Sequence, residues 1–170
     1  VVLALDGIMQ QRGIDGRCTI GVMDVRPGSP NVIPGEVFFT VDIRNPTVAE
    51  LDQMDQEFRD AVAALVADGT MQIDVKETWF SPPVHFDAGC VAAVRHGAKT
   101  AGHAFRDIMS GAGHDAVHVS KIAPAAMIFV PCKDGISHNE AEYSAPEHLA
   151  AGCDVLLRAV LEYANRDVAE

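Results

Sequence analysis

The segment Ser-Gly-Ala-Gly-His-Asp at residues 110–115 holds the first side chains that could carry chemistry. It lies between a predicted strand and a predicted helix, where glycines let a ligand approach the backbone and helix amides can meet a negative oxygen. No Gly-Lys-Ser/Thr follows, so the segment is not a P-loop. His114 and His118 are four residues apart and could face a metal together, with Asp115 beside them. The alternative is an ordinary strand-to-helix turn with two histidines near a helix start, one of them solvated.

A second candidate is His138, in the segment Gly-Ile-Ser-His-Asn-Glu at residues 135–140. This loop follows a predicted buried strand, and α/β sheets bind their ligands beyond the carboxyl ends of strands. One imidazole cannot hold a catalytic zinc, which needs about three protein ligands, so most of such a site would come from elsewhere. Glu140 and Glu142 could support His138, although helix-cap or surface roles also fit them. Nothing around Cys132 resembles a Cys–His dyad, and we interpret it as a buried structural thiol.

Asn31 and Arg44 form a third candidate, because they flank a loop-to-strand segment and offer an amide and a guanidinium. An arginine on the non-core face of a sheet, with an amide nearby, could hold a carboxylate in a bidentate fork. The competing interpretation is an ion pair between Arg44 and Asp42 or Glu36, since exposed pairs are common and weak. The residue types alone leave both interpretations open.

Hydrophobic periodicity predicts the elements that would position Asn31 and Arg44. In chain order these are a helix end at 1–12, a β-prone run at 19–25, an alternating strand at 36–44, a helix at 47–69 and a second alternating strand at 71–76. Thr47 and Glu50 have the spacing of a capping box at the start of the long helix. This order predicts a small α+β unit with helices on one side of an antiparallel sheet.

The proline pair in Ser-Pro-Pro at residues 81–83 predicts a boundary, because paired prolines force extended backbone. The elements expected after it are a helix capped by Asp87 and ending near Ala101, a short strand at 106–109, a helix after 110–113, a buried strand at 125–130, and a final helix opened by a second capping box at 144–147. The final helix is expected to bury one apolar line, made of Leu149, Cys153, Leu156, Val160 and Tyr163. Alternating helix and strand predicts an α/β layer with parallel strands. Two strands do not complete such a sheet. Either the sheet has unusually few strands, or its other strands belong to sequence that is absent.

Composition and charge limit the classes of partner. The 170 residues are 48% hydrophobic, as in an ordinary globular protein, and their formal net charge is −11. The negative charge opposes any role that depends on neutralising nucleic-acid phosphates or anionic lipid head groups. The longest apolar stretch, at 123–132, contains proline and is far shorter than the roughly 20 residues that span a bilayer. We therefore expect no transmembrane helix, no nucleic-acid partner and no membrane partner.

The cysteines and the first residues indicate a compartment. The four cysteines are widely scattered and contain no C-x-x-C pair, so free thiols in a reducing compartment are the economical interpretation. We expect a cytoplasmic protein. The chain begins Val-Val-Leu-Ala-Leu without a basic region, which is not a signal peptide and looks like a helix entered partway along.

Taken together, three motifs resemble one enzyme family. They are residues 27–35 (Pro-Gly-Ser-Pro-Asn-Val-Ile-Pro-Gly) leading into 41–44 (Val-Asp-Ile-Arg), residues 110–115, and residues 136–139 (Ile-Ser-His-Asn). In this order they strongly resemble the hydantoinase/carbamoylase branch of the M20 metallopeptidase family, which includes N-carbamoyl-L-amino-acid hydrolases, allantoate amidohydrolases and β-ureidopropionases. The resemblance covers essentially the whole chain.

The resemblance implies a division into two domains. Family members have an α/β catalytic domain with two divalent metals, interrupted by a smaller α+β domain that acts as a lid and mediates dimerisation. Residues 1–81 resemble the later part of the lid, and residues 82–170 resemble the C-terminal segment of the catalytic domain. The resemblance also implies that most metal ligands, the general-base glutamate and the lid histidine that polarises the scissile carbonyl would lie before Val1. No catalytic residue is therefore expected in these 170 residues.

The resemblance also implies roles for individual residues. His138 matches the last metal ligand, and Asn31 and Arg44 match the lid residues that bind the substrate carboxylate in the partner subunit's site. Gly113 matches a backbone contact to substrate, and His114 belongs to the same substrate-binding signature. The implied cofactor is a pair of divalent ions, zinc or manganese, or alternatively cobalt or nickel.

The implied activity is metal-assisted hydrolysis of linear C–N bonds in N-carbamoyl amino acids or allantoate, by a homodimer formed through the lid. The partner expected in the site is thus a small ureido carboxylate, and the isolated 170 residues are expected to be inactive. One alternative is a non-catalytic dimerisation or binding module. Another is a related M20 peptidase or aminoacylase, which would share His138 but need not share Asn31 and Arg44.

Overall fold

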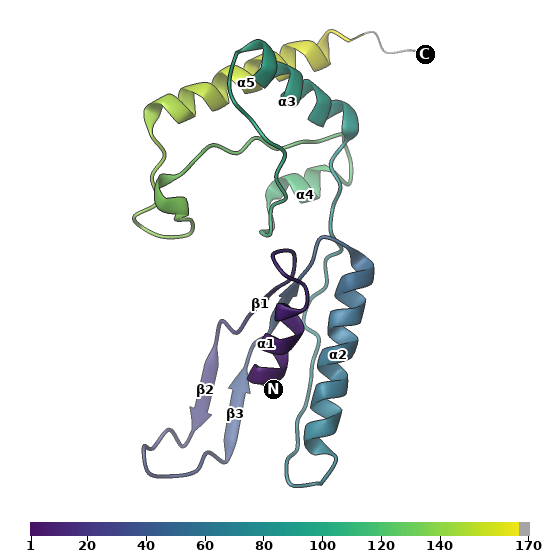
Figure 1. The fold of residues 1–170 in the computed structure, drawn as a ribbon, viewed down its shortest axis with the longest axis vertical. Coiled ribbons are helices and arrows are strands. Elements are labelled where there is room, and N and C mark those ends of the chain that lie inside the picture. The colour runs from purple at the N-terminus through teal and green to yellow at the C-terminus, as the bar shows by residue number, and fades with distance from the viewer. Residues whose placement is uncertain (167–170) are drawn as a thin grey trace. The chain divides into compact units, whose positions relative to one another are not determined.

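The computed structural model describes residues 1–166 of the chain. The chain divides into two compact units, Val1–Pro83 and Val84–Glu170, and the division falls directly after the proline pair (Figure 1). The first unit combines helices with small antiparallel ladders, and the second consists of helices joined by extended segments. The predicted mixed class of helices and small antiparallel sheets is therefore confirmed.

The strands of the first unit are β1 (Arg17–Thr19), β2 (Met23–Arg26), β3 (Glu36–Phe39) and β4 (Asp42–Arg44). β1 pairs antiparallel with β4, and β2 pairs antiparallel with β3. Between the two ladders, the Val22 amide donates to Thr40 Oγ1 and the Thr40 amide donates to the Val22 carbonyl, both at 3.2 Å. Because a hydroxyl takes the place of a ladder carbonyl there, the strand predicted at 36–44 is interrupted between β3 and β4.

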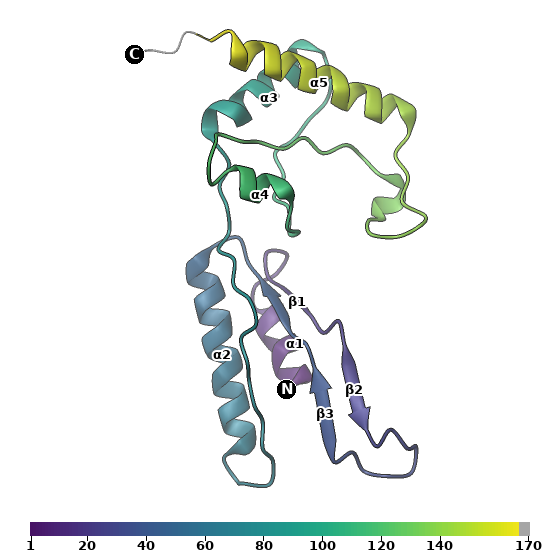
Figure 2. The ribbon, with the colours of Figure 1, turned by 180° about the vertical axis from the view of Figure 1, so that it is seen from behind.

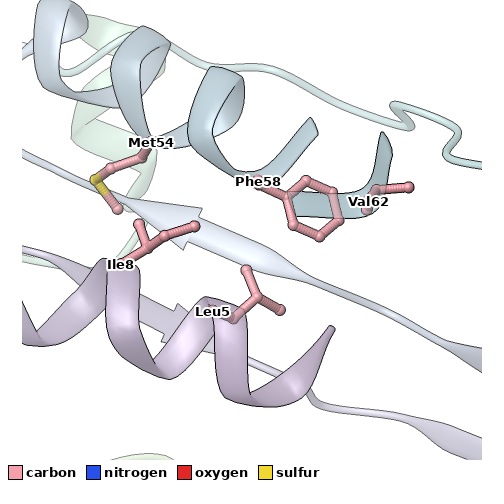
Figure 3. Packing of buried hydrophobic residues seen from close by; sticks show 5 residues of the cluster. All are labelled: Leu5, Ile8, Met54, Phe58 and Val62. Carbon is pink, nitrogen blue, oxygen red and sulfur yellow. The ribbon is translucent and has the colours of Figure 1, made fainter. Parts of the chain in front are cut away.

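Helices α1 (Val2–Gln10) and α2 (Val48–Val66) form the second layer of this unit. α1 contacts α2 and β1, and α2 contacts β4. Their buried apolar side chains meet in one cluster, which consists of Leu5, Ile8, Met54, Phe58 and Val62 (Figure 3). The spacing of three or four residues places these side chains on one face of each helix. The core of the first unit therefore lies where α1 meets α2.

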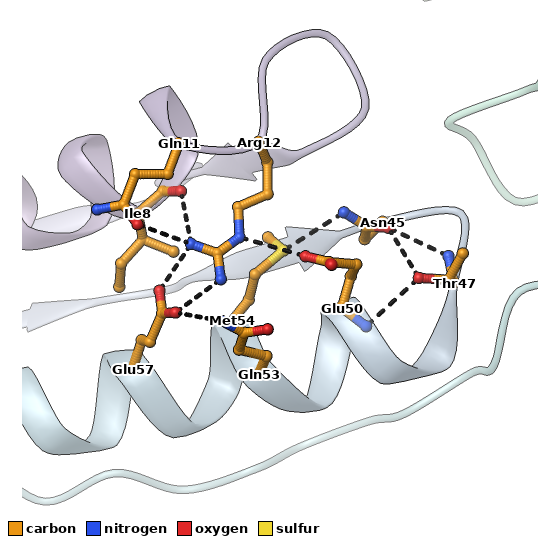
Figure 4. A network of polar contacts seen from close by, with 9 residues as sticks. All are labelled: Ile8, Gln11, Arg12, Asn45, Thr47, Glu50, Gln53, Met54 and Glu57. Atoms are coloured by element: carbon orange, nitrogen blue, oxygen red, sulfur yellow. Dashed lines mark hydrogen bonds and ion pairs between the residues drawn. The ribbon is translucent and has the colours of Figure 1, made fainter.

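Arg12, just after α1, joins the two helices through a polar network (Figure 4). Its side chain is 7% exposed, and its Nη1 and Nη2 each donate to one carboxylate oxygen of Glu57 at 2.7 Å. Nη1 also donates to the Ile8 carbonyl at 3.2 Å. The hydrogen bonds between the two side chains raise the pKa of Arg12 and lower the pKa of Glu57. The negative charge of Glu57 on α2 is thus paired with the nearly buried positive charge of Arg12 at the end of α1.

The predicted capping box of α2 forms only in part. Thr47 Oγ1 accepts the Glu50 amide at 3.3 Å, as a helix cap should. The Glu50 carboxylate lies 3.5 Å from Arg12 Nε and does not return to the Thr47 amide. That amide donates instead to Oδ1 of the buried Asn45, at 3.1 Å. Asn45 therefore fills the place that the sequence assigns to Glu50.

The second unit contains α3 (Ala88–Thr100), α4 (Asp115–Val119), a short 3₁₀ helix η1 (Lys133–Gly135) and α5 (Pro146–Ala164). α3 packs against α5. A Cβ at Gly97 would lie 3.0 Å from the Val155 carbonyl oxygen, so the two backbones approach closely because this position has no side chain. Asp87 caps α3 as predicted, since its Oδ1 accepts the Cys90 amide at 2.8 Å.

Three predicted strands are wrong, at residues 71–76, 106–109 and 125–130. Among residues 1–166 none of these segments joins a ladder, and both ladders belong to the first unit, so the predicted parallel layer does not form there. An extended segment becomes a strand only when its amides and carbonyls bond to a neighbouring strand. Residues 71–76 instead run back alongside α2, where Ile73 packs onto the core cluster (Figures 1 and 2).

The predictions for α5 also need correction. Ser144 does not cap this helix: its Oγ donates to the Pro131 carbonyl at 2.8 Å, and the helix begins instead with Pro146 in its first turn. The predicted apolar line is not the buried face. Leu156 and Val160 are each 54% exposed, and Val155 and Ala159 are the buried positions. The reason is that the buried residues of α3 are small, and the face of α5 that carries Val155 and Ala159 packs closely against them.

No helix in the described part of the chain is long and apolar enough to cross a membrane. All four cysteines have free thiols, as the sequence predicts.

Met54 has no exposed surface in the core between α1 and α2. We expect Met54→Ala to lower the free energy of unfolding of the first unit by about 2–5 kcal/mol, because it removes apolar contacts and leaves a cavity. Urea denaturation followed by circular dichroism measures this loss. The control is Asp52→Ala on the exposed side of α2, which should change stability by less than about 0.5 kcal/mol. Equal losses in the two variants would contradict the placement of the core.

Candidate functional site

The glycine-rich segment forms a turn in which Ser110 and His114 face each other. Ser110 Oγ lies 2.7 Å from His114 Nε2 and accepts the Ala112 amide at 3.2 Å. The His114 ring also meets the edge of the Phe129 ring, with centroids 5.4 Å apart and an interplanar angle of 66°. A hydrogen bond and an aromatic contact thus restrain the half-buried imidazole.

Gly113 lies next to this imidazole and leaves the backbone open. It is exposed, and a Cβ added to it would meet no atom within 4 Å. The chain's own packing therefore does not require glycine at this position. The backbone at this position is open to its surroundings.

His138 lies in the loop between η1 and α5, with an exposed side chain. Its φ of +56° is uncommon for a residue with a Cβ and costs of order 1 kcal/mol. The loop is fixed by local bonds: the His138 amide donates to Glu142 Oε2 and the Ala141 amide donates to Asn139 Oδ1, both at 2.9 Å. Glu142 therefore supports the backbone of His138. This local strain is consistent with a functional position.

The described residues do not complete a metal site. No group of three or more histidine, cysteine, aspartate or glutamate side chains in residues 1–166 could hold a metal ion. His114, His118 and Asp115 thus do not form the cluster that their spacing suggests. His138 could supply one imidazole, which is fewer than the roughly three protein ligands of a catalytic zinc site.

Arg44 on β4 pairs with Asp42 on the same strand. Its Nε donates to Asp42 Oδ1 at 2.9 Å and its Nη2 donates to Oδ2 at 2.6 Å. These hydrogen bonds lower the pKa of Asp42 and raise the pKa of Arg44. The structure therefore contains the ion pair that the sequence leaves as an alternative. An incoming carboxylate would compete with Asp42 for two of the guanidinium donors.

Asn31 lies in the exposed loop between β2 and β3, where Ser29 Oγ donates to its Oδ1 at 2.8 Å. The extended segment 36–44 separates it from Arg44. At about 3.3 Å per residue, this segment spans roughly 25 Å. The structure of one chain therefore does not bring the Asn31 and Arg44 side chains to one carboxylate.

The contact between Ser110 and His114 is not predictable from the sequence pattern. The available signal is a hydroxyl four residues before a histidine in a glycine-rich turn, a spacing that is uninformative until the turn geometry is known. The sequence pattern also does not predict an open pocket of about 280 Å³, which is lined by His85, Asp87, Ser120, Ala123, Pro124 and Ala125. The Asp87 carboxylate in this pocket already caps α3, which leaves it poorly placed for a ligand.

Comparisons with known proteins identify the family of this chain and several of its relatives. A model of peptidase family M20/M25/M40 matches residues 5–162. The chain is 43% identical to an N-carbamoyl-L-amino-acid amidohydrolase from Rhizobium meliloti, over 86% of this chain and 35% of that protein. It is 33% identical to an allantoate amidohydrolase from Bacillus subtilis, over 82% of this chain and 34% of that protein. The chain thus spans about a third of the length of these relatives.

A solved structure is similar over nearly the whole chain. It is an amidase of the hydantoinase/carbamoylase family from Burkholderia multivorans, with a TM-score of 0.91 and 48% sequence identity. The alignment covers 98% of this chain and 41% of that one.

The Asp42–Arg44 pair predicts a pH dependence. Because the folded pKa of Asp42 is lowered, its stabilisation is fully present above the ordinary aspartate pKa of about 3.9 and is lost as the pH falls through the lowered value. The carboxyl ¹³C shift of Asp42, followed against pH, should therefore titrate below the ordinary range. Arg44→Gln should move the midpoint up, and the control Arg26→Gln on β2 should leave it unchanged. If Arg44→Gln leaves the Asp42 midpoint unchanged, the ion pair between Asp42 and Arg44 is contradicted.

Proposed function

Since this chain belongs to peptidase family M20/M25/M40, we propose that it works as part of a metal-dependent amidohydrolase that cleaves linear C–N bonds of N-carbamoyl amino acids or allantoate. The membership confirms the resemblance drawn from the three sequence motifs. The observation that carries the proposal is the similarity of nearly the whole chain to a solved amidase of the hydantoinase/carbamoylase family. The two relatives named for carbamoyl amino acids and allantoate support the substrate class.

In this proposal, residues 1–81 belong to a lid and dimerisation domain. The two-layer arrangement of α1 and α2 against β1 and β4 supports an independently folded unit. The β2–β3 ladder exposes large apolar side chains, which supports contact with a second copy: Met23 is 51%, Val37 46% and Phe38 57% exposed. Burial of such surface is the main driving force of most protein association.

Residues 82–170 form the C-terminal segment of the catalytic domain in this proposal. The segments at 106–109 and 125–130 are extended but have no ladder partners among the described residues. Their apolar side chains include Ile108 at 54% and Phe129 at 45% exposure. Both features support a position beside further polypeptide of the same enzyme, which would supply neighbouring strands.

His138 is the residue of this chain that we assign to a metal. Two divalent ions, zinc or manganese, or alternatively cobalt or nickel, would lower the pKa of a bound water when present. His138 contributes a single exposed imidazole, and Glu142 binds the backbone amide of the same residue. The remaining ligands and the general base would come from other parts of the enzyme, because residues 1–166 contain no group of three or more side chains that could hold a metal ion.

Arg44 holds the substrate carboxylate of the partner subunit's site in this proposal, by taking it into the fork that Asp42 occupies. A planar guanidinium binds carboxylates in two parallel hydrogen bonds, which suits this exchange. The resemblance assigns Asn31 to the same carboxylate, although within one chain its side chain does not reach that of Arg44. The Gly113 backbone and His114 contact the substrate from the turn of the second unit. We also place the protein in a reducing compartment such as the cytoplasm, and its four free thiols support this location.

The reaction is tested directly on the complete enzyme. It should release ammonia from N-carbamoyl amino acids or allantoate, lose activity with a chelator and regain it with a divalent metal. His138→Ala should abolish the activity and lower the bound metal, while His148→Ala on the exposed side of α5 should change neither. The isolated 170 residues should show no chelator-sensitive activity. Turnover of N-acyl amino acids or dipeptides, with none of carbamoyl substrates, would favour the peptidase or aminoacylase alternative.

The carboxylate site is tested by Arg44→Lys in the complete enzyme. Loss of one charge-assisted hydrogen bond costs about 1.5–3 kcal/mol, so KM for the substrate should rise roughly ten- to hundredfold. The matched control is Arg26→Lys, which changes an exposed arginine paired with Asp24 on the neighbouring ladder. An unchanged KM for Arg44→Lys would remove Arg44 from the carboxylate site.

A further inference from the structure

We propose that Ser110 is a positioning residue for His114: it occupies Nε2 of the imidazole and thereby leaves Nδ1–H as the donor that faces a ligand oxygen. Ser110 Oγ and His114 Nε2 are 2.7 Å apart, a short distance for a hydrogen bond between neutral groups. Both residues are half-buried.

The distances around Ser110 Oγ favour the hydroxyl as the donor to His114 Nε2. The hydroxyl has one hydrogen and two lone pairs, and one lone pair accepts the Ala112 amide at 3.2 Å. Its hydrogen has two available acceptors, His114 Nε2 at 2.7 Å and the Ala112 carbonyl at 3.4 Å. The second distance lies beyond the usual range of about 2.5–3.0 Å for O–H···O bonds. We therefore assign the hydroxyl as the donor to its nearer acceptor, Nε2, so that the neutral ring carries its proton on Nδ1.

Two further contacts keep the ring in this orientation. Phe129 packs edge to face against it, and the His114 carbonyl accepts the Val117 amide at 3.0 Å, which fixes its backbone at the start of α4. Within the described residues, Nδ1 has no hydrogen-bond partner, and it is not among the buried unsatisfied atoms. Nδ1–H is thus a solvent-accessible donor beside the open backbone of Gly113.

A donor of this kind suits a carbonyl or carboxylate oxygen, which is the chemistry of a ureido substrate. This step rests on the proposed function. A role for Ser110 as a nucleophile would need a carboxylate that orients the histidine through Nδ1, and the described residues place none there. Ser110 therefore acts through His114, by fixing the tautomer that presents a donor to the ligand.

The tautomer can be measured in the complete enzyme without any activity assay. Long-range ¹H–¹⁵N spectra, recorded where the imidazoles are neutral, distinguish Nδ1–H from Nε2–H for each histidine. We expect His114 to be mainly Nδ1–H in the native chain, to change to mainly Nε2–H in Ser110→Ala, and to return to Nδ1–H in Ser110→Thr. The control Ser120→Ala removes a hydroxyl that binds the Val117 carbonyl and should not change the tautomer. Nε2–H in the native chain, or the same tautomer in Ser110→Ala, would overturn the proposal.

Kinetics of the complete enzyme separate this proposal from the proposed function. Ser110→Ala should lower kcat/KM for the ureido substrate about three- to tenfold, the effect of one misplaced neutral hydrogen bond, and Ser110→Thr should restore it. If the tautomer changes while kcat/KM does not, His114 does not donate to the substrate and this part of the proposal fails. If the native tautomer is Nδ1–H and the complete enzyme does not act on ureido substrates, the proposed function fails and the Ser110–His114 assignment stands.

Discussion

The nearly buried guanidinium of Arg12 joins the two helices of the first unit. It lies at the end of α1 and binds both carboxylate oxygens of Glu57 on α2, so its desolvated charge is compensated from the opposite helix. Removing one partner would leave the other charge unpaired, and an unpaired buried charge is strongly unfavourable. Because α1 contacts β1 and α2 contacts β4, the ladder that carries Arg44 depends on this helix pair.

The helices of this chain could be predicted from sequence far better than its strands. Thr47 and Asp87 are local caps whose hydrogen bonds involve residues three positions away, so the signal and the structure occupy the same few residues. A strand depends on a partner that the local sequence does not specify. Residues 71–76 and 125–130 have the composition of strands, yet in the part of the chain described here they have nothing to pair with. The apolar line of α5 failed for a related reason, since the small residues of α3 decide which face is buried.

The candidate site shows the same dependence on contacts between residues. The types of Arg44 and His138 were readable from the sequence, and so was the possibility that Arg44 pairs with Asp42. The separation of Asn31 from Arg44 follows from ladder register, which sequence spacing does not reveal. The Ser110–His114 bond requires a turn that brings two side chains together, and glycine content predicts a turn without its geometry. Sequence therefore identified the chemical groups, and the fold determined which of them meet.

The two ladders of the first unit are nested, and nesting imposes an order on their formation. β2 and β3 enclose only the loop at residues 27–35, whereas β1 and β4 enclose everything from 20 to 41. Closing a longer loop costs more chain entropy, and contacts close in sequence form first. Once β2 and β3 have paired, the Val22–Thr40 contact leaves β1 and β4 a short distance to close. Pairing at the tip that carries Asn31 thus shortens the loop that must close before the strand that carries Arg44 meets its partner, an influence that requires no contact between them.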